Sequence, residues 1–325
     1  MELQPLDADS IRLKVAYCGI CGTDMHIYHG HMDTRVQPPH IMGHEACGVV
    51  EDVGGNVKNI MPGDRGVVMP LWPCGTCPAC RAGLSHICHN LKFIGIETPG
   101  AFQQYWDIPA SAFLNIPETL SMKHAALIEP MAVACHDLRI GLVQPGENVV
   151  VLGAGPIGLM IAMLAAQKGA NVTISEISKS RLALAESASL CTVNPRETDL
   201  VEYITEKIGG AGADVVFEVT AHPAGAEMMT ALPRCRGRIV VVGIFSEPVK
   251  VNLHRFFWRE LQLFGARVYQ REDFEQAIRL ADGGDVPLDT FITNVYDLEN
   301  APAAFEYLSA GNEAMKVLIQ CNNDL

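Results

Sequence analysis

Basic residues are scarce in this chain of 325 residues. It holds 24 lysines and arginines against 37 aspartates and glutamates, which gives a formal net charge of −13. Such a surplus of negative charge repels nucleic acids and anionic membrane surfaces, so we expect neither as a partner. The first ten residues, MELQPLDADS, lack the basic start and the apolar stretch of a secretory signal. We therefore expect a cytoplasmic protein, long enough for two domains with separate cores.

Internal repeats and low-complexity segments are also lacking, but one run carries no charge. Residues 149–166 contain no charged side chain, which would be compatible with a membrane span. Three glycines and a proline interrupt this run, however. A strand buried on both faces and followed by a buried helix explains the composition better. We therefore predict no membrane association for this segment.

Cysteine, in contrast, is abundant, with eleven residues. Disulfides are rare in the cytosol, so a cysteine cluster there indicates metal binding or catalysis. Cys74, Cys77, Cys80 and Cys88 follow a C-x2-C-x2-C-x7-C pattern in the turn-rich loop 73–90. Four thiolates suit a closed tetrahedral zinc site, which would stabilise the loop and take no part in chemistry. Four unrelated buried thiols, or a zinc ribbon that binds nucleic acid, fit this polar loop with few basic residues less well.

A glycine-rich turn follows an apolar strand at Val149–Val151 and opens an apolar helix. Gly153 permits the tight turn, Gly155 lets the backbone approach a pyrophosphate, and Gly158 allows the helix to pack closely on the strand. Free N–H groups at the start of the helix favour a phosphate there. Glu176 ends the next strand, where its carboxylate can bind the hydroxyls of an adenosine ribose and repel a 2′-phosphate. The pattern predicts a dinucleotide site for NAD and not for NADP.

The pattern of expected secondary structure changes after the first third of the chain. Short strands separated by turns are expected first, at 11–16, 48–52 and 66–69. Strands then alternate with helices from residue 146, which predicts a parallel sheet covered by helices on both faces. We expect strands at 171–175, 192–193, 214–219, 238–242, 261–268 and 316–320, and helices at 125–138, 179–188, 199–208, 225–232, 273–281 and 302–309. The result is an α/β protein with a mainly-β domain at 1–125, a doubly wound Rossmann domain at 126–268, and a segment at 269–325 that returns to complete the first domain.

Four dispersed residues form a second possible metal site: Cys21, His44, Glu45 and Glu129. Singly they mean little, because a lone histidine is more often structural and Glu129-Pro130 could be only a helix start. Together they offer a thiolate, an imidazole and carboxylate oxygens. This is a ligand set for an open catalytic zinc that keeps one position for water or substrate.

In their order along the chain, these motifs resemble the zinc-dependent medium-chain dehydrogenases. The resemblance rests on CGICGTD at 18–24, GHE at 43–45, the four-cysteine loop, Glu129-Pro130 and GAGPIG at 153–158. Within the family, the chain looks most similar to the polyol branch that acts on sorbitol or xylitol, with threonine and 2,3-butanediol dehydrogenases as near relatives. The resemblance implies a GroES-like catalytic domain beside the Rossmann domain, one catalytic and one structural zinc, NAD, and a homodimer or homotetramer. It also implies that some twenty N-terminal residues of the family pattern are missing, which would affect the edge of the first domain.

The resemblance further implies roles for single residues. Cys21 and His44 would bind the catalytic zinc, with Glu45 or Glu129 as a direct or exchanging carboxylate ligand. Thr23 would accept the substrate proton and His26 would pass it onward. The residues that would bind NAD are Gly153, Gly155, Pro156, Ile157, Gly158, Glu176, Arg181, Val242, Gly243, Ile244 and Arg267, and Arg267 and Tyr269 are possible substrate contacts.

The sequence thus predicts an oxidoreductase that transfers a hydride between NAD and a secondary alcohol of a polyol or sugar alcohol. Threonine or 2,3-butanediol remains an alternative substrate. Two readings of other classes are a zinc-free reductase of activated double bonds and an inactive nucleotide-binding scaffold. The joint presence of Cys21, His44 and Glu129 argues against the first of these.

Overall fold

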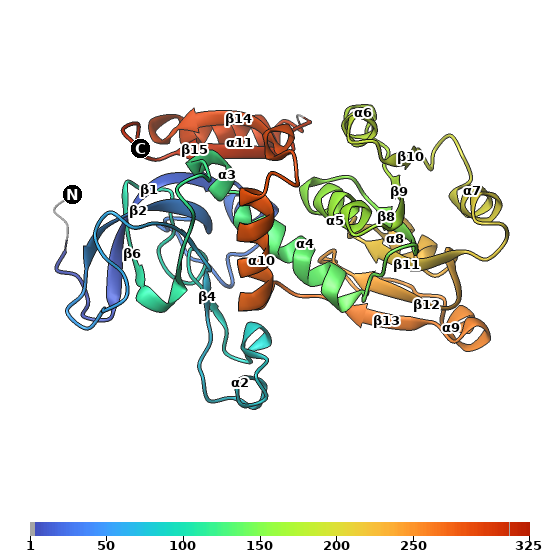
Figure 1. Ribbon diagram of the computed structural model, residues 1–325, viewed down its shortest axis with the longest axis horizontal. Helices are drawn as coiled ribbons and strands as arrows, with labels where there is room; N and C mark the ends of the chain where they lie inside the picture. Colours follow the sequence, from blue (N-terminus) through green and yellow to red (C-terminus); the bar gives the residue numbers. More distant parts are fainter. Residues whose placement is uncertain (1–3, 312) are drawn as a thin grey trace. The chain divides into compact units, whose positions relative to one another are not determined.

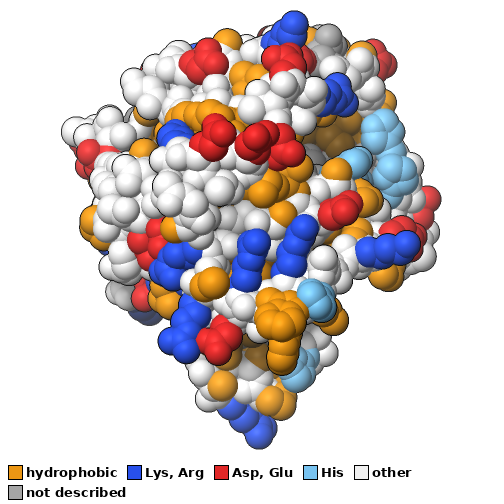
Figure 2. Space-filling view, turned by 90° about the vertical axis from the view of Figure 1, so that its right-hand side faces the viewer, with side chains coloured by type: hydrophobic (Ala, Val, Ile, Leu, Met, Phe, Trp, Pro, Cys, Tyr) orange, Lys and Arg blue, Asp and Glu red, His pale blue; other side chains and the backbone are white. Residues whose placement is uncertain are grey.

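The computed structural model describes residues 4–311 and 313–325, which divide into two compact units (Figure 1). Unit 1 contains the described residues up to Pro130 together with Gln270–Leu325, and unit 2 contains Met131–Tyr269. Acidic, basic and hydrophobic side chains are interspersed on the face shown in Figure 2. None of the helices in the described ranges has both the length and the apolar character needed to cross a membrane.

Unit 2 is built on a six-stranded parallel sheet. Its strands lie in the order β10-β9-β8-β11-β12-β13, which is 3-2-1-4-5-6 when counted along the chain of this unit. This is the strand order of a doubly wound dinucleotide-binding fold. The strands are β8 (Asn148–Leu152), β9 (Asn171–Ser175), β10 (Cys191–Val193), β11 (Ala213–Glu218), β12 (Pro233–Val241) and β13 (Gln262–Gly265).

Alternation along the sheet strands explains why helices cover both faces of unit 2. Val150 and Leu152 of β8 belong to a core shared with α7 (Leu200–Lys207) and α8 (Pro223–Met228). Val151 points the other way, toward Gly158 in α5 (Pro156–Gln167). Every side chain from Val149 to Leu152 is therefore buried, as expected for a parallel strand. The charge-free run 149–166 is this strand and helix, as the sequence predicted.

The remaining helices of unit 2 are the greater part of α4 (Ile128–Ile140), α6 (Lys179–Ser187) and α9 (Leu253–Arg259). α6 and α4 end within two residues of their expected positions, whereas α9 was not predicted. The expected strand 261–268 stops at Gly265, because Val268 has a φ of 50°, which a strand does not accommodate. The expected helix 125–138 is two helices, since Pro130 lacks an N–H and is tolerated only in a first turn.

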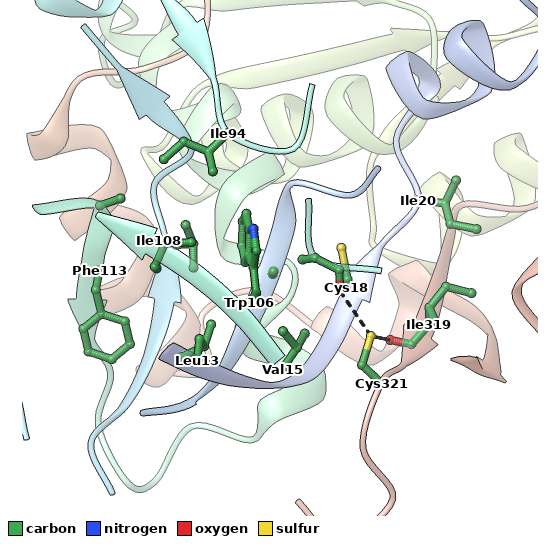
Figure 3. Close-up of a cluster of buried hydrophobic side chains, with 14 of the residues drawn as sticks. Leu13, Val15, Cys18, Ile20, Ile94, Trp106, Ile108, Phe113, Ile319 and Cys321 are labelled. Carbon is green, nitrogen blue, oxygen red and sulfur yellow. Dashed lines mark hydrogen bonds between the residues drawn. The ribbon is translucent and has the colours of Figure 1, made fainter. Parts of the chain in front are cut away.

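Unit 1 is a mainly antiparallel β-structure around one core. The sheet runs β14-β15-β1-β2-β3-β7, with β6 also paired to β1, and β4 pairs with β5 separately. Trp106, Leu13 and Ile108 are at most 1% exposed in its centre (Figure 3). The strands are β1 (Ser10–Gly19), β2 (Glu45–Val53), β3 (Arg65–Val68), β4 (Leu71–Trp72), β5 (Lys92–Phe93), β6 (Tyr105–Pro109), β7 (Phe113–Asn115), β14 (Ile292–Asp297) and β15 (Lys316–Gln320).

The C-terminal segment enters the sheet of unit 1 through β15, which pairs antiparallel with β1 and parallel with β14. Its Ile319 and Cys321 lie against Cys18 and Val15 in the core (Figure 3). Two helices of this unit were not predicted, α1 (Gly22–Tyr28) and the short α2 (Pro78–Arg81). α1 begins directly after Cys21, where the Asp24 side chain accepts the Cys21 N–H and caps the helix start. The helices of unit 1 are α1 (Gly22–Tyr28), α2 (Pro78–Arg81), α3 (Met122–Ala125), the start of α4, α10 (Arg271–Asp282) and α11 (Ala301–Ser309), and the short 3-10 turns are η1 (Ser85–Ile87), η2 (Ala110–Ala112), η3 (Leu288–Phe291) and η4 (Leu298–Asn300).

Candidate metal centres and nucleotide pocket

The antiparallel pairing of β1 and β2 brings Cys21, His44 and Glu45 together. Gly19 at the end of β1 is opposite Glu45 at the start of β2, so the residues that flank the two strand ends become neighbours. One ligand atom from each of Cys21, His44 and Glu45 lies within 4.8 Å of the others. A side chain at position 19 would collide with Glu45, because an added Cβ would lie 2.2 Å from its Oε2. Glycine at 19 thus leaves room for this carboxylate.

Asp24 orients two members of the cluster. Its Oδ2 accepts a hydrogen bond from the Cys21 N–H at 2.8 Å, and its Oδ1 lies 3.6 Å from His44 Nδ1. Burial alone lowers the pKa of His44, but the charges of Asp24 and Cys21 outweigh it and leave that pKa well above its usual value. A carboxylate that faces Nδ1 leaves Nε2 for a metal, as in many metal sites. Sequence reasoning quoted Asp24 within its motif but gave it no role.

Lys316 neutralises Glu45 from the opposite side. Its ammonium donates to both carboxylate oxygens of Glu45 at 2.7 Å and to the carbonyl of Ile20 at 3.3 Å. Burial lowers the pKa of Lys316, yet the charges of Glu45, Cys21 and Glu129 raise it above its usual value. Sequence reasoning missed this residue, although a lone lysine that opens an otherwise apolar strand was the available signal.

Glu129 is near this cluster but not part of it. It is buried in the first turn of α4, and its charge reaches Lys316. The three side chains whose ligand atoms converge are those of Cys21, His44 and Glu45. Thr23 is half-buried in the first turn of α1, and His26 is exposed in its last turn. The set of one sulfur, one imidazole and one carboxylate suits zinc with a position left open.

The four cysteines of loop 73–90 also converge, with all four sulfurs within 4.8 Å of one another. The Cys88 sulfur lies 3.4 Å from that of Cys74 and 3.7 Å from that of Cys77. Zinc with Zn–S bonds of about 2.3 Å in a tetrahedron requires sulfurs about 3.8 Å apart, close to this spacing. Backbone N–H groups that point at sulfur lower the pKa of Cys74 to about 5 and lower that of Cys77 as well. Burial raises the pKa of Cys80 to about 12, with hydrogen bonds to Cys77 and Cys88 acting in the same direction. Before a metal binds, the loop therefore favours thiolates at Cys74 and Cys77 but a protonated thiol at Cys80.

Unit 2 contains a cavity of about 560 Å³ at the carboxyl ends of β8 and β9. Gly153 has a φ of 101°, and a side chain at Gly158 would lie 2.0 Å from the Gly153 carbonyl, so both positions require glycine. Gly155 and Pro156 begin α5 as N-cap and first residue. The cavity is lined by Leu152, Gly153, Gly155, Ser175, Glu176, Ile177, Arg181, Pro195, Arg196, Val219, Thr220, His222, Ala224, Gly225 and Met228.

Two charged residues face each other in this cavity. Glu176 accepts hydrogen bonds from the N–H groups of Ala154, Ile177 and Ser178 at 2.7–3.0 Å. An Arg181 guanidinium nitrogen lies 3.9 Å from Glu176, and Arg181 Nε is buried with no hydrogen-bond partner among the described residues. A buried donor without a partner fits a cavity that holds a polar ligand. Arg196, which also lines the cavity, was not foreseen from the sequence.

Further residues expected to contact the cofactor or the substrate lie outside this cavity. Val242 and Gly243 follow β12 and donate their N–H groups to the Glu218 carbonyl at 2.9 Å. Ile244 is 87% exposed, Arg267 is exposed after β13, and Tyr269 is fully buried. Among the described residues, none of these five lines the 560 Å³ cavity, and Ile157 at the second position of α5 does not line it either.

Comparison with known proteins identifies the family. The model of the alcohol dehydrogenase GroES-like domain matches residues 7–118, and that of the zinc-binding dehydrogenase domain matches residues 156–283. A 2-dehydro-3-deoxy-L-galactonate 5-dehydrogenase of Pseudoalteromonas atlantica is 47% identical over 97% of this chain and 92% of its own. A sorbitol dehydrogenase of Bacillus subtilis is 32% identical over 99% and 93%.

Solved structures agree with these matches. A crystal structure of an Escherichia coli alcohol dehydrogenase in complex with NADH is 30% identical, has a TM-score of 0.91, and is matched over 98% of this chain and 94% of its own. The expected pairing of a GroES-like domain with a Rossmann domain is thereby confirmed. The chain belongs to the zinc-dependent medium-chain dehydrogenases, in the branch that resembles polyol dehydrogenases.

Proposed function

We propose that this chain catalyses the reversible oxidation of a secondary alcohol in a polyol or a sugar acid to the ketone, with NAD as hydride acceptor. The observation that carries the proposal is the convergence of Cys21, His44 and Glu45 within 4.8 Å, backed by Asp24 and Lys316. A zinc ion bound there would make a substrate hydroxyl far more acidic, as it does bound water.

The candidate site residues of unit 1 then have defined roles. Cys21 and His44 hold the metal, Asp24 fixes the imidazole, and Glu45 supplies a carboxylate whose charge Lys316 balances. Thr23 receives the proton of the substrate hydroxyl, and His26 passes it to solvent, for which its exposed position is suited. The four cysteines Cys74, Cys77, Cys80 and Cys88 hold a second, structural zinc.

The cavity of unit 2 supports NAD as the cofactor. Three backbone N–H groups donate to the Glu176 carboxylate at the end of β9, where it would bind ribose hydroxyls and repel a 2′-phosphate. Arg181, whose Nε has no hydrogen-bond partner among the described residues, would bind the adenosine half. Val242, Gly243, Ile244 and Arg267 remain proposed contacts of the nicotinamide side.

The substrate class follows from the relatives. The relative that shares 47% of its residues is named for a sugar acid, and another is named for sorbitol. We therefore place 2-dehydro-3-deoxy-L-galactonate beside sorbitol and xylitol as the first substrates to examine. Threonine and 2,3-butanediol complete the panel.

We further propose a homo-oligomer in the cytoplasm. All eleven cysteines are free, as suits a reducing compartment. In unit 2, α9 and the edge strand β13 expose Leu253, Phe257, Trp258 and Leu263 to between 48% and 77%. A second copy of the chain that pairs with this edge would cover both the apolar side chains and the unpaired strand.

The test combines metal analysis with turnover on that panel. The protein as purified should hold two zinc ions per chain and produce NADH from at least one of the alcohols. Cys21→Ala should lose turnover and one zinc while it still binds NADH, measured by nucleotide fluorescence. Cys235→Ala is the matched control, because Cys235 is exposed and lies outside both cysteine clusters. Retained turnover in Cys21→Ala would refute the proposal.

A further inference from the structure

The end of α1 carries a backbone motif that joins two histidines. Gly30 has a φ of 76°, and its N–H donates to the Ile27 carbonyl at 2.9 Å. The N–H of His31 donates to the carbonyl of His26, also at 2.9 Å. These two bonds define a Schellman motif, in which the side chains at the positions of His26 and His31 normally make a hydrophobic contact. Here both positions hold an imidazole.

The two rings lie at the spacing of metal ligands. The Nδ1 atoms of His26 and His31 are 3.3 Å apart, and the ring centroids are 5.6 Å apart. A metal with nitrogen bonds of about 2.0–2.1 Å and tetrahedral angles places two such atoms about 3.3 Å apart. A direct N–H···N hydrogen bond at this distance is at the long end of the usual range. The spacing therefore accommodates a shared cation as well as the hydrogen bond between the rings.

A third histidine is close to the pair. The ring of His29, the C-cap residue of α1, has its centroid 6.0 Å from that of His31, and its Nε2 lies 3.3 Å from Ser309 Oγ. All three histidines are exposed, so water can supply the remaining ligands of a metal. Among the described residues, the groups of three or more converging ligands are the two already described, so this site has two protein ligands as it stands.

We propose that His26 and His31 form a surface site for a divalent transition-metal ion that prefers imidazole, of the class of Ni²⁺, Cu²⁺ and Zn²⁺. The Schellman motif fixes the backbone positions of the two ligands, so that less conformational freedom is lost on binding. The site is separate from the two zinc clusters, since it shares no residue with them.

A consequence rests on the proposed function, in which His26 passes the proton to solvent. A cation bound to Nδ1 of His26 occupies the lone pair that would otherwise accept the proton. Excess metal should therefore slow alcohol oxidation. The metal concentration that halves the rate should equal the concentration that half-fills the site. Binding is measured without turnover, so failure of the site and failure of the proposed function can be told apart.

The experiment is equilibrium dialysis of the zinc-loaded protein against NiCl₂, with nickel and zinc counted by mass spectrometry. The wild type should bind one Ni²⁺ per chain with both zinc ions retained. His31→Ala and His31→Gln should each raise the nickel dissociation constant by about tenfold or more, because even partners outside the ligand shell are worth ~10–100-fold. Gly30→Ala, which strains the left-handed residue of the motif, should raise it too.

His254→Ala is the control, because His254 is an exposed histidine in unit 2 that accepts a hydrogen bond from Trp258. It should bind nickel as the wild type does. Absence of bound nickel at millimolar NiCl₂, or equal binding by wild type and His31→Ala, would overturn the site. If nickel binds but leaves the rate of a competent substrate unchanged, the inhibitory consequence is wrong.

Discussion

The ammonium of Lys316 lies 2.7 Å from both carboxylate oxygens of Glu45, and both side chains are buried. The pair joins β15, close to the C-terminus, to the first residue of β2. In the metal-free cluster the ammonium of Lys316 balances the charge of Glu45, and the proposed zinc would add further positive charge. The stability of unit 1 and its metal content should therefore depend on each other through this pair.

Lys316→Met should destabilise the protein most when it is free of metal. The variant leaves the Glu45 carboxylate buried without its partner, and breaking a buried pair in this way costs about 3–5 kcal/mol. A zinc ion on Glu45 would offset part of that cost, so the loss should shrink in the zinc-loaded form. Urea unfolding of both forms measures it, and Lys14→Met serves as control because Lys14 pairs with Asp324 at the surface. If the variant lost the same unfolding free energy with and without zinc, Lys316 would not be coupled to the metal site.

Much of this cluster could be predicted from the sequence, because Cys21, His44 and Glu45 lie in short motifs that carry their chemistry locally. The same holds for the cysteine loop and for the turn at Gly153. What could not be predicted depends on pairing between distant strands. Lys316 reaches Glu45 only because β15 pairs with β1, and a lone lysine at the start of an apolar strand does not identify its partner in the sequence.

The fold shows the same division. The repeating pattern of unit 2 predicted its strands to within a few residues, since buried parallel strands are continuous apolar runs. In unit 1, β4, β5, β6, β7 and β14 were missed. The first two have only two residues each, and β14 alternates between half-buried and exposed side chains in a sequence, ITNVYD, with few apolar residues.

Cys77→Ala should release the structural zinc and lower thermal stability while it leaves the catalytic zinc in place. Removal of one thiolate opens the tetrahedral site, and loss of a metal is among the few causes of large destabilisation. Zinc content should fall from two ions to one, and the unfolding temperature should fall by at least ~5 °C in a calorimetric scan. Cys235→Ala should change neither quantity. A stable variant with one zinc would mean that the loop does not need its metal.

Glu176→Gln should weaken the preference for NAD over NADP. The substitution keeps the size of the side chain but removes the negative charge that would repel a 2′-phosphate and bind the ribose hydroxyls. Hydrogen bonds to a charged group contribute about 1.5–3 kcal/mol, so the ratio of kcat/KM for NAD to that for NADP should fall about tenfold or more. Steady-state kinetics with both cofactors measures the ratio. Glu186→Gln, outside the cavity, should leave it unchanged.

Phe257→Asp combined with Leu263→Asp should convert the oligomer to a monomer of 35.2 kDa. Both side chains are exposed on α9 and β13, and a carboxylate buried in an apolar interface without a partner opposes association. Light scattering after gel filtration gives the mass. Met61→Asp changes a residue that is 65% exposed in unit 1, and it should remain oligomeric. A wild-type protein that is already monomeric would refute the proposed contact.

The contribution of Glu218 to the free energy of unfolding should decrease as the pH rises from about 4 toward neutrality. Burial raises the pKa of this carboxyl above its usual value of 4.5, against the opposing effect of hydrogen bonds from Thr220 and Ala221. Between the unfolded and the folded pKa, the folded protein therefore binds more protons than the unfolded chain, and its stability declines with increasing pH. Glu218→Gln lacks this titration, so the unfolding free energy of wild type minus that of the variant should decrease from pH 4 to pH 7. Urea unfolding across that range measures the difference. Zinc release affects both proteins alike, so its effect cancels when the two free energies are subtracted. A difference that grows with pH would mean that the folded protein holds this carboxylate more favourably as an anion.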